Sequence, residues 1–343
     1  DLVHSPLEQG VLVSRSINIS SVNIGSIFNM MESPRTIWSS PNQPLSLSFG
    51  SAITLSASGD DRFEQIMNDA NFSLSNTDID TIGSKTFPLK FFGGFSFDAR
   101  HKKSPPWSGF PSALFVLPRV QLTQSKNGFE LTLNEYGNGI DPTQVELNLL
   151  SLKSKLESTP VSSYPVLPPQ LIKLTPSVSR NLWTSQLTDV LSIIENKSLD
   201  KIVLAQSLKA TLKHPLTPLN TFYTLRDQNP GCYHFLFEPL DGNTMFGATP
   251  ELLVSLEGNM IQTEILAGSI ARGDSELTDV TLAKELLASS KNQHEHSLVL
   301  DALNSKISSF ATDIAGPGLK TRLTRRIRIY NQNQQSCLKF HTF

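Results

Sequence analysis

Cysteine is nearly absent from this sequence of 343 residues, and its two copies stand far apart in no metal-binding or redox spacing. A disulfide scaffold is therefore excluded, and a reducing compartment is expected. Long apolar runs are missing too, so no segment of about 18 residues is predicted to cross a membrane. The N-terminus lacks the basic start and apolar core of a secretory signal. These absences favour a cytoplasmic protein, or a plastid protein if a presequence precedes Asp1.

Charge of either sign is scarce, because charged residues make up 17% of the chain and the formal net charge is -2. Without a basic excess, neither nucleic acid nor an anionic membrane is expected as a partner. The apolar fraction of 38% is enough for a sizeable core, and the length suits one large domain or two ordinary ones. A small molecule is the expected partner.

The first half of the chain is predicted to consist mainly of strands. Alternating polar and apolar residues indicate extended structure over 1–30, followed by a pair of strands and a short helix at Asp61–Ala70. A further strand is predicted at Pro88–Asp98. Within it, Gly93 and Gly94 indicate a bulge or the close approach of another backbone.

The second half adds helices. Residues 151–178 show little periodicity and are expected to form a surface connection. An amphipathic helix then leads into an alternating segment at Lys201, and a strand meander follows over 232–266. Two helices are predicted at about Ser275–Ser289 and Lys291–Phe310. Runs of strands and then helices, without regular βαβ alternation, favour an α+β fold with antiparallel sheets.

Lys201 opens the alternating segment KIVLAQ, whose two faces are both largely apolar. A strand buried on both sides would leave the lysine ammonium partly desolvated, and a neutral amine can act as a general base. The alternative is a lysine at the end of a strand that extends its ammonium into water. The pattern alone leaves both interpretations open.

Glu295 is placed on the inward stripe of the last predicted helix. Four apolar residues share that stripe, namely Val299, Leu303, Ile307 and Phe310. A carboxylate there needs a metal or a paired cation, because burying a bare charge is costly. The flanking His294 and His296 lack the spacing of a zinc-binding helix, so an oxygen-ligated Mg²⁺ fits better. A salt bridge to a lysine or arginine is the equally supported alternative.

Two further features are less specific. Glu251 follows Gly-Ala-Thr-Pro and precedes an apolar run, where a carboxylate is either an acid kept protonated by its surroundings or a helix cap. The turn at Leu266–Ser269 presents backbone N–H groups suited to a carboxylate ligand. Arg272 and Gly273, just beyond it, are equally compatible with ordinary turn chemistry.

Together the phrases KIVLAQ, FGATPELL, LAGS and SSKNQHEH resemble the chorismate-utilising enzymes, and most closely the isochorismate synthases. The spacing agrees, because Lys201 and Glu251 are fifty residues apart and Glu251 and Glu295 are forty-four apart. In the first half, FFGGFSFD, the W-x-x-F of Trp107–Phe110 and the LPR phrase look like the same family. The resemblance covers roughly residues 10–310.

The resemblance implies one α+β domain over residues 1–310, with two large, mainly antiparallel sheets packed together and helices outside. It implies a monomeric enzyme that converts chorismate to isochorismate. Lys201 would deprotonate the water that attacks C2, and Glu251 would protonate the hydroxyl that leaves C4. Glu295 would hold Mg²⁺, while Gly268 and Ser269 would contact the substrate carboxylate. The product would enter quinone, siderophore or salicylate synthesis.

Two features depart from the family pattern. The position three before Glu295, usually acidic in the family, is Asn292, which weakens the support of a metal ligand. After about Ser309 the pattern ends, and the basic segment 311–343 is expected to be solvated or poorly ordered rather than part of a sheet. The chain would then lack the family's C-terminal region, which supplies a second metal-ligating glutamate and further substrate-binding groups.

Three hypotheses follow from these observations. The first is an isochorismate synthase, and the second is a salicylate synthase of the same family, which also eliminates pyruvate. The third is a truncated, catalytically inactive paralogue. The ammonia-using anthranilate and aminodeoxychorismate synthases are less favoured, because the HEH phrase and its surroundings resemble the hydroxyl-shifting members.

Overall fold

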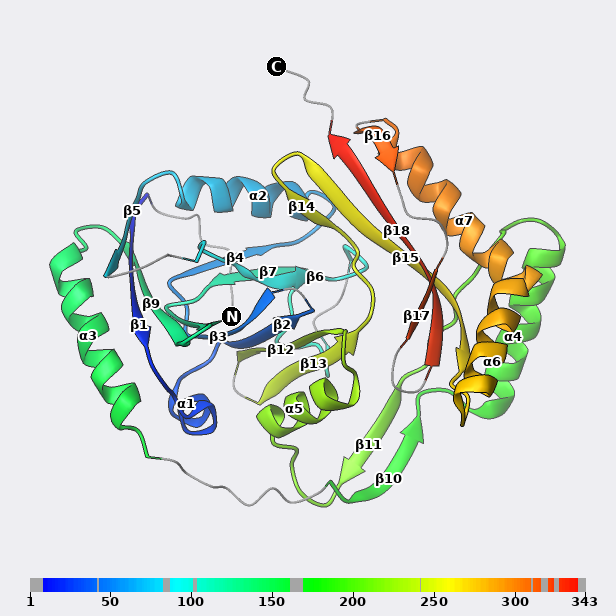
Figure 1. Cartoon of the computed structure of the whole chain (residues 1–343), viewed down its shortest axis with the longest axis horizontal. Helices are drawn as coiled ribbons and strands as arrows, with labels where there is room; N and C mark the ends of the chain where they lie inside the picture. Colours follow the sequence, from blue (N-terminus) through cyan, green and yellow to red (C-terminus); the bar gives the residue numbers. More distant parts are fainter. Residues whose placement is uncertain are drawn as a thin grey trace. The chain divides into compact units, whose positions relative to one another are not determined.

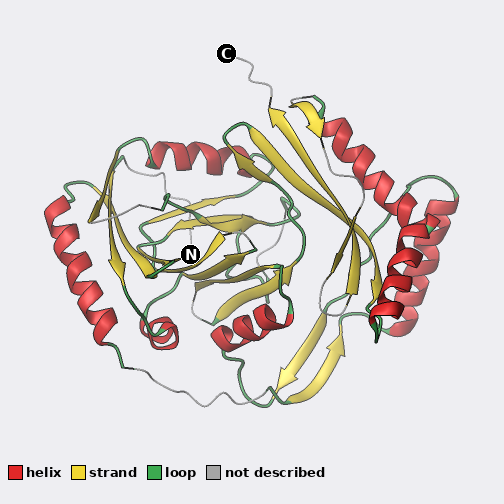
Figure 2. Ribbon diagram, in the orientation of Figure 1, coloured by secondary structure: helices red, strands yellow, loops and turns green. Residues whose placement is uncertain are grey.

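The computed structural model describes residues 9–41, 43–82, 87–100, 104–160, 169–240, 242–309, 311–315, 320–323 and 327–338. Helices and mainly antiparallel strands alternate irregularly along the chain, which confirms the predicted α+β class (Figure 1, Figure 2). The chain divides into two compact units that interleave in sequence. Unit 1 comprises Asp1–Val166, Thr217–Arg226 and Tyr233–Ala248, and unit 2 comprises Leu167–Leu216, Asp227–Cys232 and Thr249–Phe343. The single domain over 1–310 stays a prediction.

The main sheet of unit 1 has eight strands in the order β13-β12-β2-β3-β8-β9-β1-β5. Its strands are β1 (Val11–Ile19), β2 (Arg35–Ser40), β3 (Gln43–Phe49), β5 (Thr77–Ile82), β8 (Val120–Ser125), β9 (Gly128–Gly137), β12 (Tyr233–Leu240) and β13 (Asn243–Thr249). A smaller sheet has the order β4-β7-β6, with β4 (Ile53–Ala57), β6 (Phe92–Phe95) and β7 (Ala113–Leu117). The helices are α1 (Ile24–Met30), α2 (Arg62–Ser73), α3 (Pro142–Ser158) and α5 (Pro218–Gln228).

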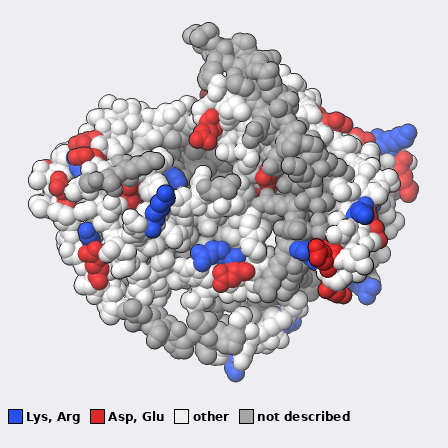
Figure 3. Space-filling view, viewed as in Figure 1, with Lys and Arg blue, Asp and Glu red and all other residues white. Residues whose placement is uncertain are grey.

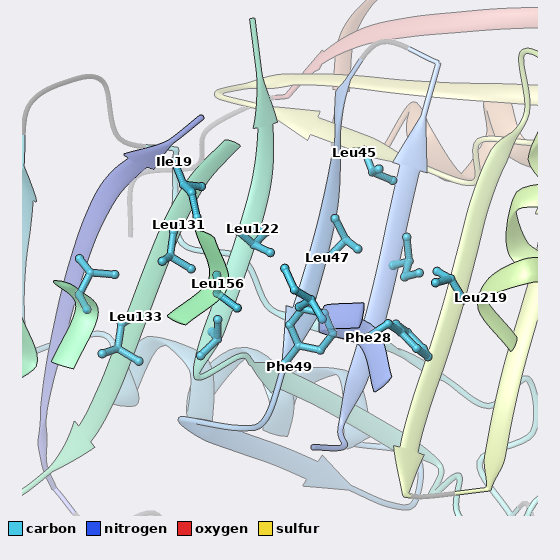
Figure 4. Packing of buried hydrophobic residues seen from close by; sticks show 14 of the residues in the cluster. Ile19, Phe28, Leu45, Leu47, Phe49, Leu122, Leu131, Leu133, Leu156 and Leu219 are labelled. Carbon is cyan, nitrogen blue, oxygen red and sulfur yellow. The ribbon is translucent and has the colours of Figure 1, made fainter. Parts of the chain in front are cut away.

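Unit 1 buries apolar side chains on both faces of its main sheet. Successive residues of β1 point to opposite faces, so Val13 and Leu12 belong to different clusters. Val13 packs in a cluster that includes side chains of α1, α3 and α5. Phe28 of α1, Leu156 of α3 and Leu219 of α5 are labelled in Figure 4. Leu12 packs instead with β4, β7 and α2, for example with Leu55. The main sheet is therefore covered on both faces.

The contact between β2 and β12 includes a buried ion pair. Arg35 Nε donates to Glu238 Oε2 over 2.9 Å, and the two side chains are 17% and 3% exposed. Arg35 Nη1 also donates to the carbonyl of Phe28 over 3.1 Å. Buried charges need such partners, because their desolvation is otherwise uncompensated. Strands from distant parts of the chain are joined in this way.

Unit 2 is built around the long strand β15. Its larger sheet has the order β14-β15-β18-β16, with β17 also paired to β18. These strands are β14 (Ser255–Glu257), β15 (Met260–Ala271), β16 (Ala311–Ala315), β17 (Lys320–Leu323) and β18 (Ile327–Leu338). A separate pair is formed by β10 (Leu171–Pro176) and β11 (Leu208–Leu212), and the helices are α4 (Arg180–Glu195), α6 (Glu276–Ala288) and α7 (Ser290–Ile307). Both α6 and α7 contact β15.

The structure differs most from the sequence-based expectation in the last segment. The solvated or poorly ordered tail was predicted from its basic composition, but β16, β17 and β18 lie within it. Strand β18 pairs antiparallel with β15, from Met260 opposite Cys337 to Ala271 opposite Ile327. The alternating phrase Ile-Arg-Ile-Tyr at its start is typical of a strand. The prediction of a solvated tail gave more weight to the net charge of the segment than to this alternation.

Two helices were also missed. Helix α1 interrupts the region predicted to be extended over 1–30, and α3 extends through Ser158 into the predicted connection. The close backbone approach expected at Gly93 is confirmed, because a Cβ there would overlap the carbonyl of Leu114. The helix expected at Asp61–Ala70 is confirmed as α2.

The face drawn in Figure 3 carries scattered charged side chains of both signs among many uncharged ones. Within the ranges that the structure covers, no helix has both the length and the apolar character that a membrane span requires.

Candidate functional site

Lys201 and Glu295, which lie ninety-four positions apart in the sequence, form an ion pair. The distance from Lys201 Nζ to Glu295 Oε1 is 3.3 Å, and the two side chains are 27% and 36% exposed. The structure therefore brings together the candidate base and the candidate metal ligand. The pairing also realises the salt-bridge alternative for Glu295. The two interpretations of Glu295 are compatible, since an accessible carboxylate can exchange one cation for another.

Helix α7 sets the position of Glu295. Ser289 caps the helix by accepting a hydrogen bond from the N–H of Asn292 over 3.4 Å. The predicted stripe holds at Ile307, which is buried at 4% exposure, while Phe310 lies outside the described residues. Of the two imidazoles, His296 is buried and His294 is exposed. Val299 and Leu303 are half-buried, so Glu295 lies at the partly open, N-terminal end of a stripe that is fully buried only at Ile307 among the described residues.

The prediction of a strand buried on both sides at Lys201 is wrong. Residues 201–206 have no sheet pairing, and Val203 is 77% exposed. The segment is held at its end, where Ser207 and Ser177 exchange hydrogen bonds. Alternation predicts a strand only where neighbouring strands pair with it, and among the described residues none pairs with this segment. Lys201 itself is only partly exposed, because it lies against Glu295.

Glu251 lies in a segment without regular secondary structure between β13 and β14 rather than at the start of a helical turn. Its N–H donates to Thr249 Oγ1 over 3.3 Å. The two residues that follow it are fixed to β15, because the N–H of Glu264 donates to the Leu252 carbonyl over 2.9 Å and Thr263 Oγ1 donates to the Leu253 carbonyl over 2.6 Å. Its side chain is exposed, and among the described ion pairs Lys201 is joined to Glu295 rather than to Glu251.

Strand β15 bends at Gly268. Before this point its side chains alternate, and Thr263, Ile265 and Ala267 are buried. The register with β18 then shifts between Ala267 and Ser269, which marks a bulge, and Ser269 is exposed. Gly268 adopts a φ of +73°, in the left-handed region that favours glycine. The predicted glycine turn is thus a bulge within a strand.

Gly268 lies directly against Asn292 of α7. A Cβ at Gly268 would lie 2.9 Å from both Cγ and Oδ1 of Asn292, closer than real Cβ contacts come. Asn292 and Glu295 are three residues apart on one helix, so they lie on neighbouring positions of one face. The bulge, the amide of Asn292 and the ion pair therefore form one continuous cluster.

Arg272 and Gly273 donate hydrogen bonds to a residue in the first turn of α6. Arg272 Nε donates to Asp279 Oδ1 over 2.7 Å, and the N–H of Gly273 donates to the same oxygen over 3.0 Å. The hydrogen bond to Asp279 raises the pKa of Arg272. Ser275 and Thr278 close the helix start as a capping box. The alternative of ordinary turn chemistry is the correct one here.

The oxygen chemistry of Glu295 fits Mg²⁺, which is commonly bound by one or two carboxylates together with waters and substrate oxygens. No group of three or more His, Cys, Asp or Glu residues gathers within the described ranges. Among the candidate residues, Glu295 is the proposed carboxylate ligand, and it is paired with Lys201. Waters and the ligand's own oxygens would have to complete the coordination.

Sequence reasoning did not identify two features of this cluster. The direct contact between Lys201 and Glu295 had no local signal, because their separation exceeds any helix or turn periodicity. The contact between Gly268 and Asn292 did have one. Asn292 stands one helical turn before Glu295, so a glycine facing Glu295 would also face Asn292.

Comparison with known proteins identifies the relatives of this chain. A family described as "Chorismate binding enzyme" matches residues 3–326. The isochorismate synthase MenF of Bacillus subtilis is 27% identical over 322 residues, which are 91% of this chain and 68% of that protein. The salicylate biosynthesis isochorismate synthase of Pseudomonas aeruginosa is 28% identical, over 93% of this chain and 67% of that protein. The chloroplastic isochorismate synthase of Catharanthus roseus is 28% identical, over 71% of this chain and 44% of that protein.

The fold has solved counterparts as well. The structure of MenF from Escherichia coli aligns with a TM-score of 0.74 at 18% identity, over 97% of this chain and 73% of that chain. DhbC from Bacillus anthracis aligns with a TM-score of 0.63 at 20% identity, over 92% of this chain and 72% of that chain. At these identities the likeness concerns the fold alone. The chain spans about two thirds of the two bacterial sequence relatives and less than half of the plant relative.

Proposed function

The chain belongs to the chorismate-binding enzyme family, and we propose that it is an isochorismate synthase. The observation that carries the proposal is the 3.3 Å contact between Lys201 and Glu295. It puts the candidate general base, Lys201, beside Glu295, the candidate ligand of Mg²⁺. The bulge at Gly268 lies against α7, the helix that carries Glu295. The relatives named above are isochorismate synthases from two bacteria and a plant.

The proposed reaction exchanges one hydroxyl for another without net consumption of water. Lys201 must lose its proton and its ion pair with Glu295 to act as the neutral amine, which then takes a proton from a water molecule whose oxygen forms a bond to C2 of chorismate. Both ring double bonds shift, from C1=C2 and C5=C6 to C1=C6 and C4=C5, and the bond from C4 to its hydroxyl breaks. Glu251 gives its proton to that hydroxyl, which leaves as water. Such general acid and base groups contribute roughly 10²–10⁴-fold each to the rate.

Binding of the substrate would use the α7 end of the cluster. Backbone N–H groups at the Gly268 bulge are suited to a carboxylate, and exposed Ser269 lies next to them. Glu295 would hold Mg²⁺, which when bound neutralises negative charge on the ring carboxylate. Glu251 is placed beside β15 by the hydrogen bonds of Leu252 and Leu253. All these groups belong to unit 2.

Product analysis distinguishes the candidate activities. The purified chain is incubated with chorismate and Mg²⁺, and the products are separated chromatographically. Isochorismate supports the proposal, whereas salicylate with pyruvate identifies a salicylate synthase. Unchanged chorismate contradicts the proposal for this chain and favours an inactive paralogue. The downstream pathway and the compartment, cytoplasmic or plastid, stay predictions.

Two substitutions test the assigned roles. Lys201→Ala and Glu251→Gln are each expected to lower kcat by roughly 10²–10⁴-fold without loss of the folded state. Lys209→Ala and Glu285→Gln are matched controls, since both residues are exposed and lie on β11 and α6, outside the cluster. Wild-type kcat in either site variant removes that residue from the mechanism.

A further inference from the structure

Asn292 is the residue through which helix α7 meets the bulge in β15. We infer that Asn292 is a positioning residue, which fixes the spacing between the Gly268 backbone and the turn of α7 that carries Glu295. Its role in catalysis rests on the proposed function. The contact itself is independent of the proposed function, because it is the 2.9 Å approach of Asn292 to the Cβ position of Gly268.

The contact is tight on the strand side. Gly268 has no side chain, and its φ of +73° gives the bulge a shape that other residues adopt only with strain. Its absent Cβ would meet three atoms of Asn292, namely Cβ, Cγ and Oδ1, all within 3.0 Å. The amide of Asn292 therefore fills the space that a side chain at Gly268 would need. A larger side chain at position 292 would have to displace the strand or the helix, whereas a smaller one would leave the bulge without this contact.

The contact is equally defined on the helix side. Asn292 lies in the first turn of α7, where its N–H donates to the capping hydroxyl of Ser289. Glu295 follows one turn later on the same face, where it reaches Lys201. Because the helix is rigid over one turn, the position of Asn292 against the bulge sets the position of Glu295 relative to Gly268.

A fixed spacing matters because both ends of the contact would act on one substrate. The bulge would contact a carboxylate through backbone N–H groups, and Glu295 would act on the same molecule through a bound cation. A misplacement of about 1 Å can cost roughly 100-fold in rate. The amide of Asn292 is also uncharged, so it supports the spacing without adding a second negative charge beside Glu295.

Three variants separate the shape of residue 292 from its charge. Asn292→Ala removes the contact, and Asn292→Asp keeps nearly the same shape but adds a negative charge. Ser305→Ala, at an exposed position of the same helix, is the control. For each variant the measurements are kcat and KM for chorismate, the Kd for Mn²⁺ by electron paramagnetic resonance, and thermal unfolding. Amide hydrogen exchange over residues 262–273 reports the bulge itself.

Asn292→Ala is expected to lower kcat at least about tenfold, to change Tm little, and to speed exchange at the bulge. Asn292→Asp is expected to keep kcat within about threefold of the wild type, and to bind Mn²⁺ more tightly because of its added charge. A wild-type kcat in Asn292→Ala overturns the inference, and so does equal damage in both variants. If the wild type itself makes no isochorismate, the proposed function fails. Independently of activity, unchanged hydrogen exchange at the bulge in Asn292→Ala would show that Asn292 does not hold the bulge in place.

Discussion

The two units use their apolar side chains differently. Unit 1 buries two clusters that cover both faces of its main sheet, and Leu47 and Leu122 within them have no exposed surface. In unit 2, helix α4 has no buried residue, and it exposes Leu182, Leu187 and Leu191 by 42–51%. The buried apolar side chains described for unit 2 are few, namely Cys232, Ile265, Ala267, Leu286, Ile307 and Ala311.

Every candidate site residue belongs to the unit with the smaller described core. Lys201, Glu251, Gly268, Ser269 and Glu295 are held by an ion pair, a bulge and backbone hydrogen bonds rather than by a cluster of apolar side chains. Regions with few buried apolar contacts open at a lower free energy than the core does. The site is therefore expected to respond to changes in polar contacts that leave unit 1 unaffected.

The largest expected effect is in the core of unit 1. Leu122→Ala removes a fully buried side chain from β8 and is expected to lower the free energy of unfolding by about 3–5 kcal/mol. Leu191→Ala, the matched change on α4 at 51% exposure, is expected to stay within about 0.5 kcal/mol. Urea unfolding followed by peptide-resolved hydrogen exchange measures both. Equal losses in the two variants would show that α4 is covered in solution as fully as the core of unit 1.

A smaller effect is expected at the ion pair. Lys201→Met removes the positive charge beside Glu295, so Mn²⁺ is expected to bind about threefold to tenfold more tightly. Stability should change little, because partly exposed ion pairs contribute about 0.2–1 kcal/mol. Titration by electron paramagnetic resonance, with Lys209→Met as the control on β11, measures the affinity. An unchanged or weaker affinity would mean that Lys201 does not compete with cations at Glu295.

The smallest effect is a pH dependence in unit 1. Glu130 is 2% exposed and accepts a hydrogen bond from the N–H of Phe87 over 2.9 Å, and burial raises its pKa. Its protonated form is therefore favoured in the folded state, and the stability that this gives is lost as the pH rises through the raised pKa. Glu130→Gln should stabilise the protein at pH 7, with the gain vanishing near pH 4. A gain that persists in acid would assign the effect to packing.

Local signals predicted much of the fold. The helix α6 was expected at Ser275–Ser289 and is found at Glu276–Ala288, because its cap and turn residues are contiguous in sequence. Helix α3 also had a signal that was missed, since Asp141 caps it, Pro142 begins it, and Val145 and Leu149 lie one turn apart on its buried face. Such elements are encoded within a few residues of themselves.

Local sequence patterns could not predict which distant segments pair with each other. Residues 201–206 alternate as a strand does, but no partner edge is present for them among the described residues. Strand β18 has that partner in β15, although its composition indicated a solvated tail. In the candidate site, spacing and resemblance nominated the individual residues, whose roles stay predictions. The contact of Lys201 with Glu295 required the fold, because nothing local to either residue specifies it.

The ion pair of Arg35 with Glu238 joins residues 203 positions apart. During synthesis at roughly 5–20 residues per second, about 10–40 s pass between the appearance of β2 and that of β12. Until then the hydrogen-bonding edge of β2 lacks its final neighbour, and an open strand edge is a template for pairing with other chains. The nascent chain must also extend through the first two segments of unit 2, Leu167–Leu216 and Asp227–Cys232, before β12 can join the sheet of unit 1. The open edge of β2 is therefore expected to be the place where the incomplete chain pairs with other chains during synthesis.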